Sequence, residues 1–277
     1  MHTAPVDQIW GSRVRISDVI ARSRGAGCAL LLIGALGGAG NVPAEPLNVY
    51  VGQGQMPFAD GTAARAGLFG DLMRELCVRT EQQCVFRSVP WRRVLSVVSG
   101  DEHGIVLNLG RTAEREDDFV WLLDVLPTPY VLASVGRSFD SLADALKAGP
   151  VAVMAGTPRA DDINAMRTGE QRVVEVTDPE QAAQLLQSGR VVAWYEIDLR
   201  AIYLWRELGY GAPLLFGKPL SRTRSHIAGS LRLEGAEGLG SRMSDAFAEM
   251  HSDGTWQRIL TSYLGLERSQ ALLSDGR

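Results

Sequence analysis

The sequence contains little of what metal-dependent and nucleophilic enzymes need. Its three cysteines form no Cys-x-x-Cys pair, and its four histidines are scattered, at His2, His103, His226 and His251. Without a His-Glu-x-x-His motif, a structural or catalytic zinc site has no support. A nucleophile elbow, a Ser/His/Asp order and a phosphate-binding loop are also missing. These absences argue against a metalloenzyme, a serine hydrolase and a P-loop protein.

A strong charge of either sign is missing as well. The 277 residues carry a formal net charge of −4, so nothing suggests a nucleic-acid surface. The chain is 45% hydrophobic and 22% charged, which is ordinary for a globular protein, and its length allows one large or two small domains. We therefore expect a globular protein with no nucleic-acid partner, no metal and no cofactor.

The first 44 residues have the layout of a secretory signal peptide. Four arginines precede an uncharged run, residues 25–41, whose apolar centre spans residues 29–36. Val42-Pro43-Ala44 then offers a small-residue cleavage site before Glu45. Basic, apolar and small residues in this order predict export, and the run is too short and glycine-rich to favour a membrane span. An uncleaved anchor remains the alternative.

Removal of residues 1–44 would leave two cysteines, Cys77 and Cys84, because Cys28 lies in the expected leader. Two cysteines in an oxidising compartment suggest one disulfide, and two free buried thiols are the alternative. Cys28 precedes the apolar centre, where a lipidated cysteine would have to follow it, so a lipoprotein is not favoured.

The remaining chain alternates between strand and helix patterns. The first half predicts three strands, at residues 47–51, 84–86 and 104–108, and two helices, at 67–79 and 91–98. The second half predicts strands at 151–154, 172–176 and 191–195, with helices at 141–148, 160–167, 179–187 and 199–208. Each half is a βαβαβ unit, which implies parallel strands with crossover helices. The tail predicts one strand, 224–231, and two helices, 237–250 and 255–264.

Several stretches together resemble the family 3 solute-binding proteins of polar amino-acid ABC transporters, over about residues 47–265. The matching stretches are Pro57-Phe58, Gly67-Leu68-Phe69-Gly70-Asp71-Leu72, Pro90-Trp91, Gly110-Arg111-Thr112-Ala113-Glu114-Arg115 before Phe119, Gly156-Thr157, Gly189-Arg190-Val191, and Asp253-Gly254-Thr255 with Ile259 and Tyr263. The segment from Cys77 to Cys84 is also similar to the disulfide segment of the lysine/arginine/ornithine and histidine binders. Each match is weak alone, and their order and spacing make the set specific.

The resemblance implies an α/β type II periplasmic-binding fold with two lobes, each a mixed, mostly parallel sheet flanked by helices. Lobe I would comprise residues 45–134 and 221–277, and lobe II residues 135–220, with two extended crossings near 130–135 and 218–224 as the hinge. The implied protein is a periplasmic monomer, not an enzyme, that closes on a small polar ligand with a carboxylate and is then recognised by an inner-membrane ABC permease. Two alternatives stay open: a cyclohexadienyl or arogenate dehydratase on the same fold, and an accessory or sensing protein.

The same resemblance assigns candidate ligand-binding residues. Arg115 occupies the carboxylate-binding position, where a planar guanidinium offers two parallel donors. Arg111 is a second candidate, with a surface salt bridge as its alternative. The other assignments are Trp91 as an aromatic wall, with core packing as the alternative, and Thr157 at a helix start, with capping as the alternative. Asn108 and Gly110 on the strand–helix loop would supply hydrogen bonds, and Glu196 and Asp198 would line a reshaped pocket.

Four positions depart from the family pattern. Gly52 stands where the family has its amine-binding aspartate, and Gln55 where it has a stacking aromatic. Pro158 replaces a threonine, and the register of the lobe II aspartate falls on Ile197. The carboxylate half of the site is therefore expected to be kept and the ammonium half rebuilt or lost, so an organic acid, a modified amino acid or a peptide fragment fits as well as an ordinary amino acid.

Overall fold

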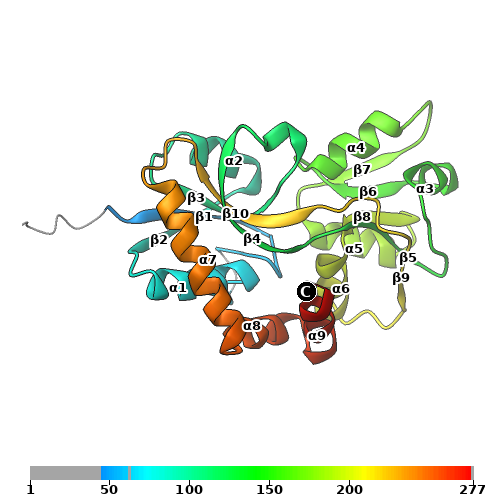
Figure 1. Cartoon of the computed structure of the whole chain (residues 1–277). Helices are drawn as coiled ribbons and strands as arrows, with labels where there is room; N and C mark the ends of the chain where they lie inside the picture. The colour runs from blue at the N-terminus through cyan, green and yellow to red at the C-terminus, as the bar shows by residue number, and fades with distance from the viewer. Residues whose placement is uncertain (1–44, 62–63, 276–277) are drawn as a thin grey trace, which may run out of the picture. The chain divides into compact units, whose positions relative to one another are not determined.

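Two five-stranded sheets flanked by helices make up the part of the chain that the computed structural model describes, residues 45–61 and 64–275 (Figure 1). We call the halves built on these sheets lobe I and lobe II. The sheet of lobe I has the strand order β2-β1-β3-β10-β4, and that of lobe II the order β7-β6-β8-β5-β9. The expected signal peptide, residues 1–44, lies outside the described residues. The predicted fold class, two α/β lobes with mixed sheets, is confirmed.

The two sheets are built by the same rule. Lobe I contains β1 (Leu47–Gly52), β2 (Cys84–Val89), β3 (Gly104–Gly110), β4 (Phe119–Pro127) and β10 (Arg224–Ser230). Lobe II contains β5 (Tyr130–Val135), β6 (Val151–Met154), β7 (Val173–Val176), β8 (Ala193–Ile197) and β9 (Leu214–Phe216). The three strands of each βαβαβ unit pair in parallel, and the other two strands of each sheet pair antiparallel.

Helices cover both sheets. They are α1 (Leu68–Arg79), α2 (Trp91–Ser99), α3 (Leu142–Ala148), α4 (Pro158–Met166), α5 (Pro179–Gln187), α6 (Asp198–Glu207), α7 (Ala236–Ser252), α8 (Thr255–Leu264) and α9 (Leu266–Asp275). Along β1, Val49 and Val51 belong to the main core, whereas Tyr50 packs with Val94 and Val98 of α2 in a second cluster. Alternate residues of one strand thus face opposite helical layers, as the two-residue period of a strand requires. No helix of the described chain is long and apolar enough to cross a membrane.

Two crossings connect the lobes, one between β4 and β5 and one between β9 and β10, and they are hydrogen-bonded to each other. The Thr128 backbone N–H donates to the Thr223 carbonyl at 2.8 Å, and the Leu220 N–H donates to the Tyr130 carbonyl at 2.7 Å. The change of sheet occurs between Pro127 and Tyr130, a few residues before the limit expected at 134, because β5 already pairs within lobe II.

The end of the chain contacts both lobes. Helix α8 packs on lobe I, where the Tyr263 hydroxyl donates to Asp71 Oδ2 at 2.7 Å. Helix α9, which the sequence analysis did not predict, carries Arg268, and this side chain forms an ion pair with Asp198 at the start of α6 in lobe II. Arg206 of α6 also donates to the Tyr263 carbonyl at 2.8 Å. The C-terminal helices are thus a third, noncovalent link between the lobes.

The predicted disulfide is present. Cys77 lies in the last turn of α1 and Cys84 begins β2, seven residues later, and their sulfurs are bonded. The bond fixes the turn that carries the chain from the helix into the edge strand of the lobe I sheet.

Replacing both cysteines by serine is expected to lower the free energy of unfolding by about 2–3 kcal/mol, because the bond restricts the loop of the unfolded chain. Urea denaturation monitored by circular dichroism measures this loss. Reductant should destabilise the wild type by a similar amount and leave the double variant unchanged. Equal stability of the wild type and the variant in the absence of reductant would contradict the assignment of a stabilising role.

Candidate functional site

A small cavity lies where the two lobes meet. Its volume is about 30 Å³. Its walls come from β3, α2 and the loop after β1 on the lobe I side, and from α4, β8 and α6 on the lobe II side. The lining residues are Gln55, Trp91, Asn108, Gly110, Arg115, Thr128, Tyr130, Thr157, Pro158, Arg159, Ile197, Arg200 and Ser225.

Five of the seven residues predicted to bind ligand line this cavity: Trp91, Asn108, Gly110, Arg115 and Thr157. They come from both lobes, as closure on a ligand requires. Glu196 and Asp198 do not line it.

Arg115 is presented by a short 3-10 helix, Ala113–Arg115, that follows β3. Among the described residues, its guanidinium donates one hydrogen bond, from Nη1 to the Gly110 carbonyl at 3.3 Å, and it has no carboxylate partner within ion-pair distance. Burial is the main cause that lowers the pKa of Arg115; Tyr130 opposes this effect, Arg159 lowers the pKa further, and the carboxylates of Asp161 and Glu114 raise it. The cation thus has carboxylates nearby, but none among the described residues forms an ion pair with it.

Two further arginines of lobe II surround a buried carboxylate. Glu196, at the end of β8, is fully buried, and its Oε1 lies 2.9 Å from Arg159 Nη2 and 3.3 Å from Arg200 Nη1. The same oxygen accepts a hydrogen bond from the Ile197 N–H at 2.7 Å. Burial is the main cause that lowers the pKa of Arg200, and Glu196 is the strongest influence that opposes this effect. Glu196 therefore neutralises the two guanidiniums from behind rather than facing the cavity.

Arg200 also reaches across to lobe I. Its Nη2 donates to Gln55 Oε1 at 2.8 Å, and its Nε donates to the Met56 carbonyl at 3.3 Å. The guanidinium lies over the Phe58 ring, 5.2 Å from its centroid. The Arg200 side chain thus lies between the lobes and forms part of the cavity wall.

Trp91, at the start of α2, lines the cavity on the lobe I side. A Cβ atom on Gly52 would lie 2.7 Å from Trp91 Cε3, closer than carbon atoms approach, so the indole fills the space beside position 52. A side chain at position 52 could reach the cavity only if the indole moved.

Asn108 and Thr157 are both buried beside the cavity but differ in their hydrogen bonding. Asn108 has a left-handed backbone, with φ at 58°, and its Oδ1 has no hydrogen-bond donor. The Thr157 hydroxyl donates to the Met154 carbonyl at 2.7 Å and accepts from the Ala160 N–H at 3.4 Å. Thr157 thus caps α4, which was the alternative reading of this residue, while Asn108 keeps an unused polar atom.

Asp198 lies outside this cluster and serves a different contact. It begins α6, accepts a hydrogen bond from the Leu199 N–H at 2.7 Å and pairs with Arg268 of α9. Burial is the main cause that raises its pKa, and Arg268 opposes that effect. Asp198 therefore joins the C-terminal helix to lobe II.

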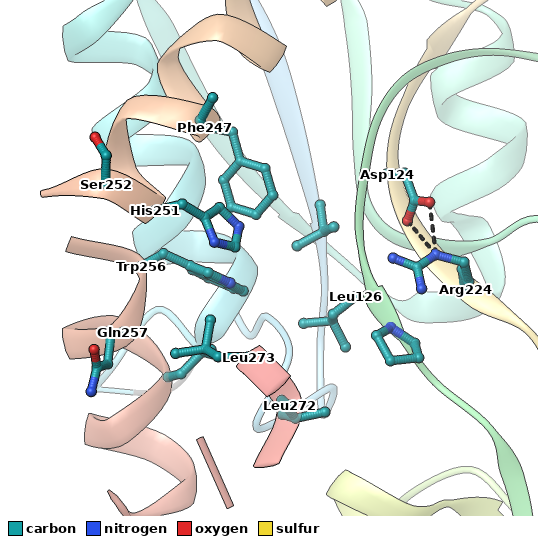
Figure 2. A pocket seen from close by; sticks show the side chains of 14 residues that line it. Asp124, Leu126, Arg224, Phe247, His251, Ser252, Trp256, Gln257, Leu272 and Leu273 are labelled. Carbon is teal, nitrogen blue, oxygen red and sulfur yellow. Dashed lines mark hydrogen bonds and ion pairs between the residues drawn. The ribbon is translucent and has the colours of Figure 1, made fainter. Parts of the chain in front are cut away.

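A larger groove of about 680 Å³ lies on lobe I, between β4 and the helices α7, α8 and α9 (Figure 2). The rings of Phe247, His251 and Trp256 line one side of it, opposite Leu126. Its arginine, Arg224, already forms a hydrogen-bonded ion pair with Asp124. We take the interlobe cavity as the candidate site despite its smaller volume, because the unbalanced charges and unused polar atoms converge there. The described residues contain no cluster of His, Cys, Asp and Glu suited to a metal ion.

Sequence reasoning missed four important lining residues: Gln55 as a donor and acceptor, Tyr130, Arg159 and Arg200. Arginine is rarely buried, so a pattern of exposed and buried positions assigns it to the surface. One signal was present, since Glu196 and Arg200 are spaced i,i+4, the spacing of neighbouring charges on a helix. Glu196, however, ends a strand, so that spacing alone did not place the pair.

No protein-family model matches the sequence, and no curated protein matches it in a sequence search. Solved structures do match. An ancestral arginine-binding protein bound to glutamine aligns with a TM-score of 0.65 and 21% identity, over 79% of this chain and 98% of that one. A histidine kinase sensor domain with similarity to periplasmic binding proteins aligns with a TM-score of 0.68 and 17% identity, over 80% of this chain and 97% of that one. An ancestral amino-acid-binding protein, a precursor of cyclohexadienyl dehydratase, aligns with a TM-score of 0.65 and 16% identity, over 79% of this chain and 95% of that one.

The alignments extend over nearly the whole of each solved chain, but the sequence identities are low. The comparisons therefore establish the architecture alone. Its features here are the paired mixed sheets, the two crossings and the cavity between the lobes. The chain therefore has the two-lobed fold of type II periplasmic binding proteins.

Proposed function

We propose that this protein is an exported, periplasmic binding protein that captures a small carboxylate-bearing ligand between its lobes, acts as a monomer and delivers the closed form to an ABC permease. One observation carries the proposal: Arg115 of lobe I and Arg159 and Arg200 of lobe II line a single cavity whose described lining residues include no Asp or Glu. Buried cations require compensation, and an anionic ligand would supply it.

Closure follows from the same arrangement. A ligand shifts an open–closed equilibrium only if it interacts differently with the two states. An anion held between Arg115 and the lobe II arginines contacts both lobes only when they are closed. The two hydrogen-bonded crossings are where the backbone would rotate.

The first test is direct identification of the ligand. Native mass spectrometry of the protein purified from its producing cells should show a bound acid with at least one carboxylate. The ligand should be lost on unfolding and rebound on refolding. A copurified neutral or cationic compound would contradict the proposal.

Arg115 should dominate the affinity for such a ligand. Arg115→Gln removes the charge-assisted hydrogen bonds and is expected to weaken the binding of a small carboxylate by about 10- to 100-fold, measured by isothermal titration calorimetry. The matched control is Arg111→Gln, because Arg111 is exposed, pairs with Glu116 and does not line the cavity. Equal losses of affinity in the two variants would indicate a general effect of surface charge and would contradict the assignment of Arg115.

The dehydratase alternative is less well supported by the site. Such an enzyme needs an acid and a base positioned beside the substrate. Glu196, the candidate that the sequence offered, is fully buried behind two guanidiniums and does not line the cavity. Release of water and carbon dioxide from prephenate or arogenate, abolished by Glu196→Gln in a protein that still folds, would establish the enzyme instead.

A sensing or accessory role is favoured by a different observation, the Arg200 bridge. A side chain that closes the lobes by itself allows a closed surface without a ligand, and one of the similar solved structures is a sensor domain. A thermal-shift screen of small acids separates the two functions. The absence of any shift would favour the sensing or accessory role over capture of a solute.

A further inference from the structure

We infer that the interlobe site takes a dicarboxylate without an ammonium group, rather than a zwitterionic amino acid. The inference rests on the proposed function and specifies its ligand. The structural feature that carries it is a surplus of positive charge on opposite walls of the interlobe cavity.

The charge count is the first step. Three guanidiniums line the cavity, those of Arg115, Arg159 and Arg200, and the described carboxylate within ion-pair distance of any of them is Glu196. Asp161 and Glu114 act on Arg115 from beyond ion-pair distance, so they compensate its charge only in part. Counted over direct contacts, three positive charges and one negative charge leave a surplus of two. A single carboxylate would neutralise half of that surplus, whereas a dianion would neutralise all of it. Burying the remainder unpaired would be costly.

The unused donors lie on both walls. On lobe I, Arg115 donates to one backbone carbonyl at 3.3 Å and keeps its other donors. On lobe II, Arg159 is almost fully buried, yet its Nε has no hydrogen-bond acceptor. One carboxylate on Arg115 and a second on the Arg159–Arg200 pair would therefore use donors that the protein leaves unsatisfied or weakly satisfied.

The hydrogen bonds of Arg200 to lobe I are ones that a ligand carboxylate would replace. Two of its acceptors on lobe I, Gln55 Oε1 and the Met56 carbonyl, are neutral. A carboxylate makes shorter and stronger hydrogen bonds to a guanidinium than a neutral oxygen does. The second carboxylate of the ligand would replace these two acceptors, and the cavity of about 30 Å³ would enlarge as the lobes adjusted around it.

An ammonium group would find no counter-charge in the same cavity, although Asn108 Oδ1 offers it one neutral, unpaired acceptor. Of the described lining residues, none is Asp or Glu, and Glu196 is already held by two guanidiniums. Position 52 offers no side chain, and Trp91 fills the space beside it. A zwitterion would bring a cation next to three others, and this repulsion should exclude it.

Matched ligands test the inference. Malonate, succinate, glutarate and adipate are titrated calorimetrically in sulfate- and phosphate-free buffer, each against its monocarboxylate and, where one exists, its 2-amino derivative. We expect the best dicarboxylate to bind at least about tenfold more tightly than both of its partners. Arg200→Gln, which leaves Glu196 paired with Arg159, should abolish most of the preference for the dicarboxylate over the monocarboxylate. The control is Arg190→Gln, which changes an exposed arginine of lobe II that does not line the cavity.

The outcomes separate this inference from the proposed function. If amino acids bind at least as tightly as dicarboxylates and depend on Arg115, the inference is overturned and the proposed function stands. If no carboxylate binds, both fail. Equal weakening of dicarboxylate and monocarboxylate binding by Arg200→Gln also overturns the assignment of the second carboxylate to lobe II.

Discussion

Glu196→Gln is expected to lower the free energy of unfolding by about 3–5 kcal/mol, because it leaves two buried guanidiniums without their counter-charge. The side chains of Glu196, Arg159 and Arg200 are 0%, 4% and 2% exposed, so water cannot solvate the cations that remain. Removing one partner of a buried ion pair costs far more than the pair contributes, since the desolvation of the survivor is no longer offset. Chemical denaturation with a two-state fit measures the change.

Two further variants sharpen this test. Glu207→Gln removes a carboxylate that is 51% exposed and pairs with Arg206 on the surface, so its effect should stay below about 1 kcal/mol. Glu196→Gln combined with Arg200→Gln removes one of the stranded cations and should recover part of the loss. If Glu196→Gln is no more harmful than Glu207→Gln, the buried carboxylate does not compensate the arginines.

Gly217→Ala should destabilise the protein by about 3 kcal/mol, because the added methyl group has no room. A Cβ at this position would lie 1.7 Å from the Phe139 carbonyl oxygen and 2.6 Å from the Phe139 carbonyl carbon, so backbone must move. The segment is held in place nearby, where the Lys218 N–H donates to Asp140 Oδ1 at 3.0 Å. The free energy of unfolding from urea denaturation gives the loss.

The matched control is Gly211→Ala. A Cβ at Gly211 would meet nothing within 4 Å, and the backbone there is not left-handed, so the change should stay within about 0.5 kcal/mol. Because both substitutions add one methyl group to a glycine of the same lobe, their difference isolates the collision with Phe139. Similar stabilities of the two variants would show that the second crossing has room to move.

The parallel core of each lobe could be predicted from the sequence, because alternating strand and helix periods imply crossover connections. Two of the strands next to the crossings, β4 and β9, could not. Residues 119–127 form a nearly continuous apolar run, which carries no period, and β9 spans only Leu214–Phe216. Helix α9 was missed because it follows α8 after a single residue, Gly265, so the tail gave no separate signal for it.

The resemblance placed residues of both lobes at the site, but of its lobe II residues only Thr157 lines the cavity. The resemblance placed Arg115 and Trp91, which lie on lobe I, and the structure brings both to the cavity wall. On lobe II it placed Glu196 among the lining residues, whereas the structure buries Glu196 and presents Arg159 and Arg200 instead. Which of several charged side chains faces inward depends on how the lobes meet, and this is set by long-range packing that local patterns do not encode.

The anchoring of α9 to lobe II has a consequence for any motion of the molecule. A rotation about the two crossings must either separate Arg268 from Asp198 or bend the chain where α8 meets α9. The carboxyl terminus is therefore mechanically coupled to the opening angle. A bulky fusion there would resist such a rotation, and a small dye there would report it, so tags for binding studies are better placed near residue 45.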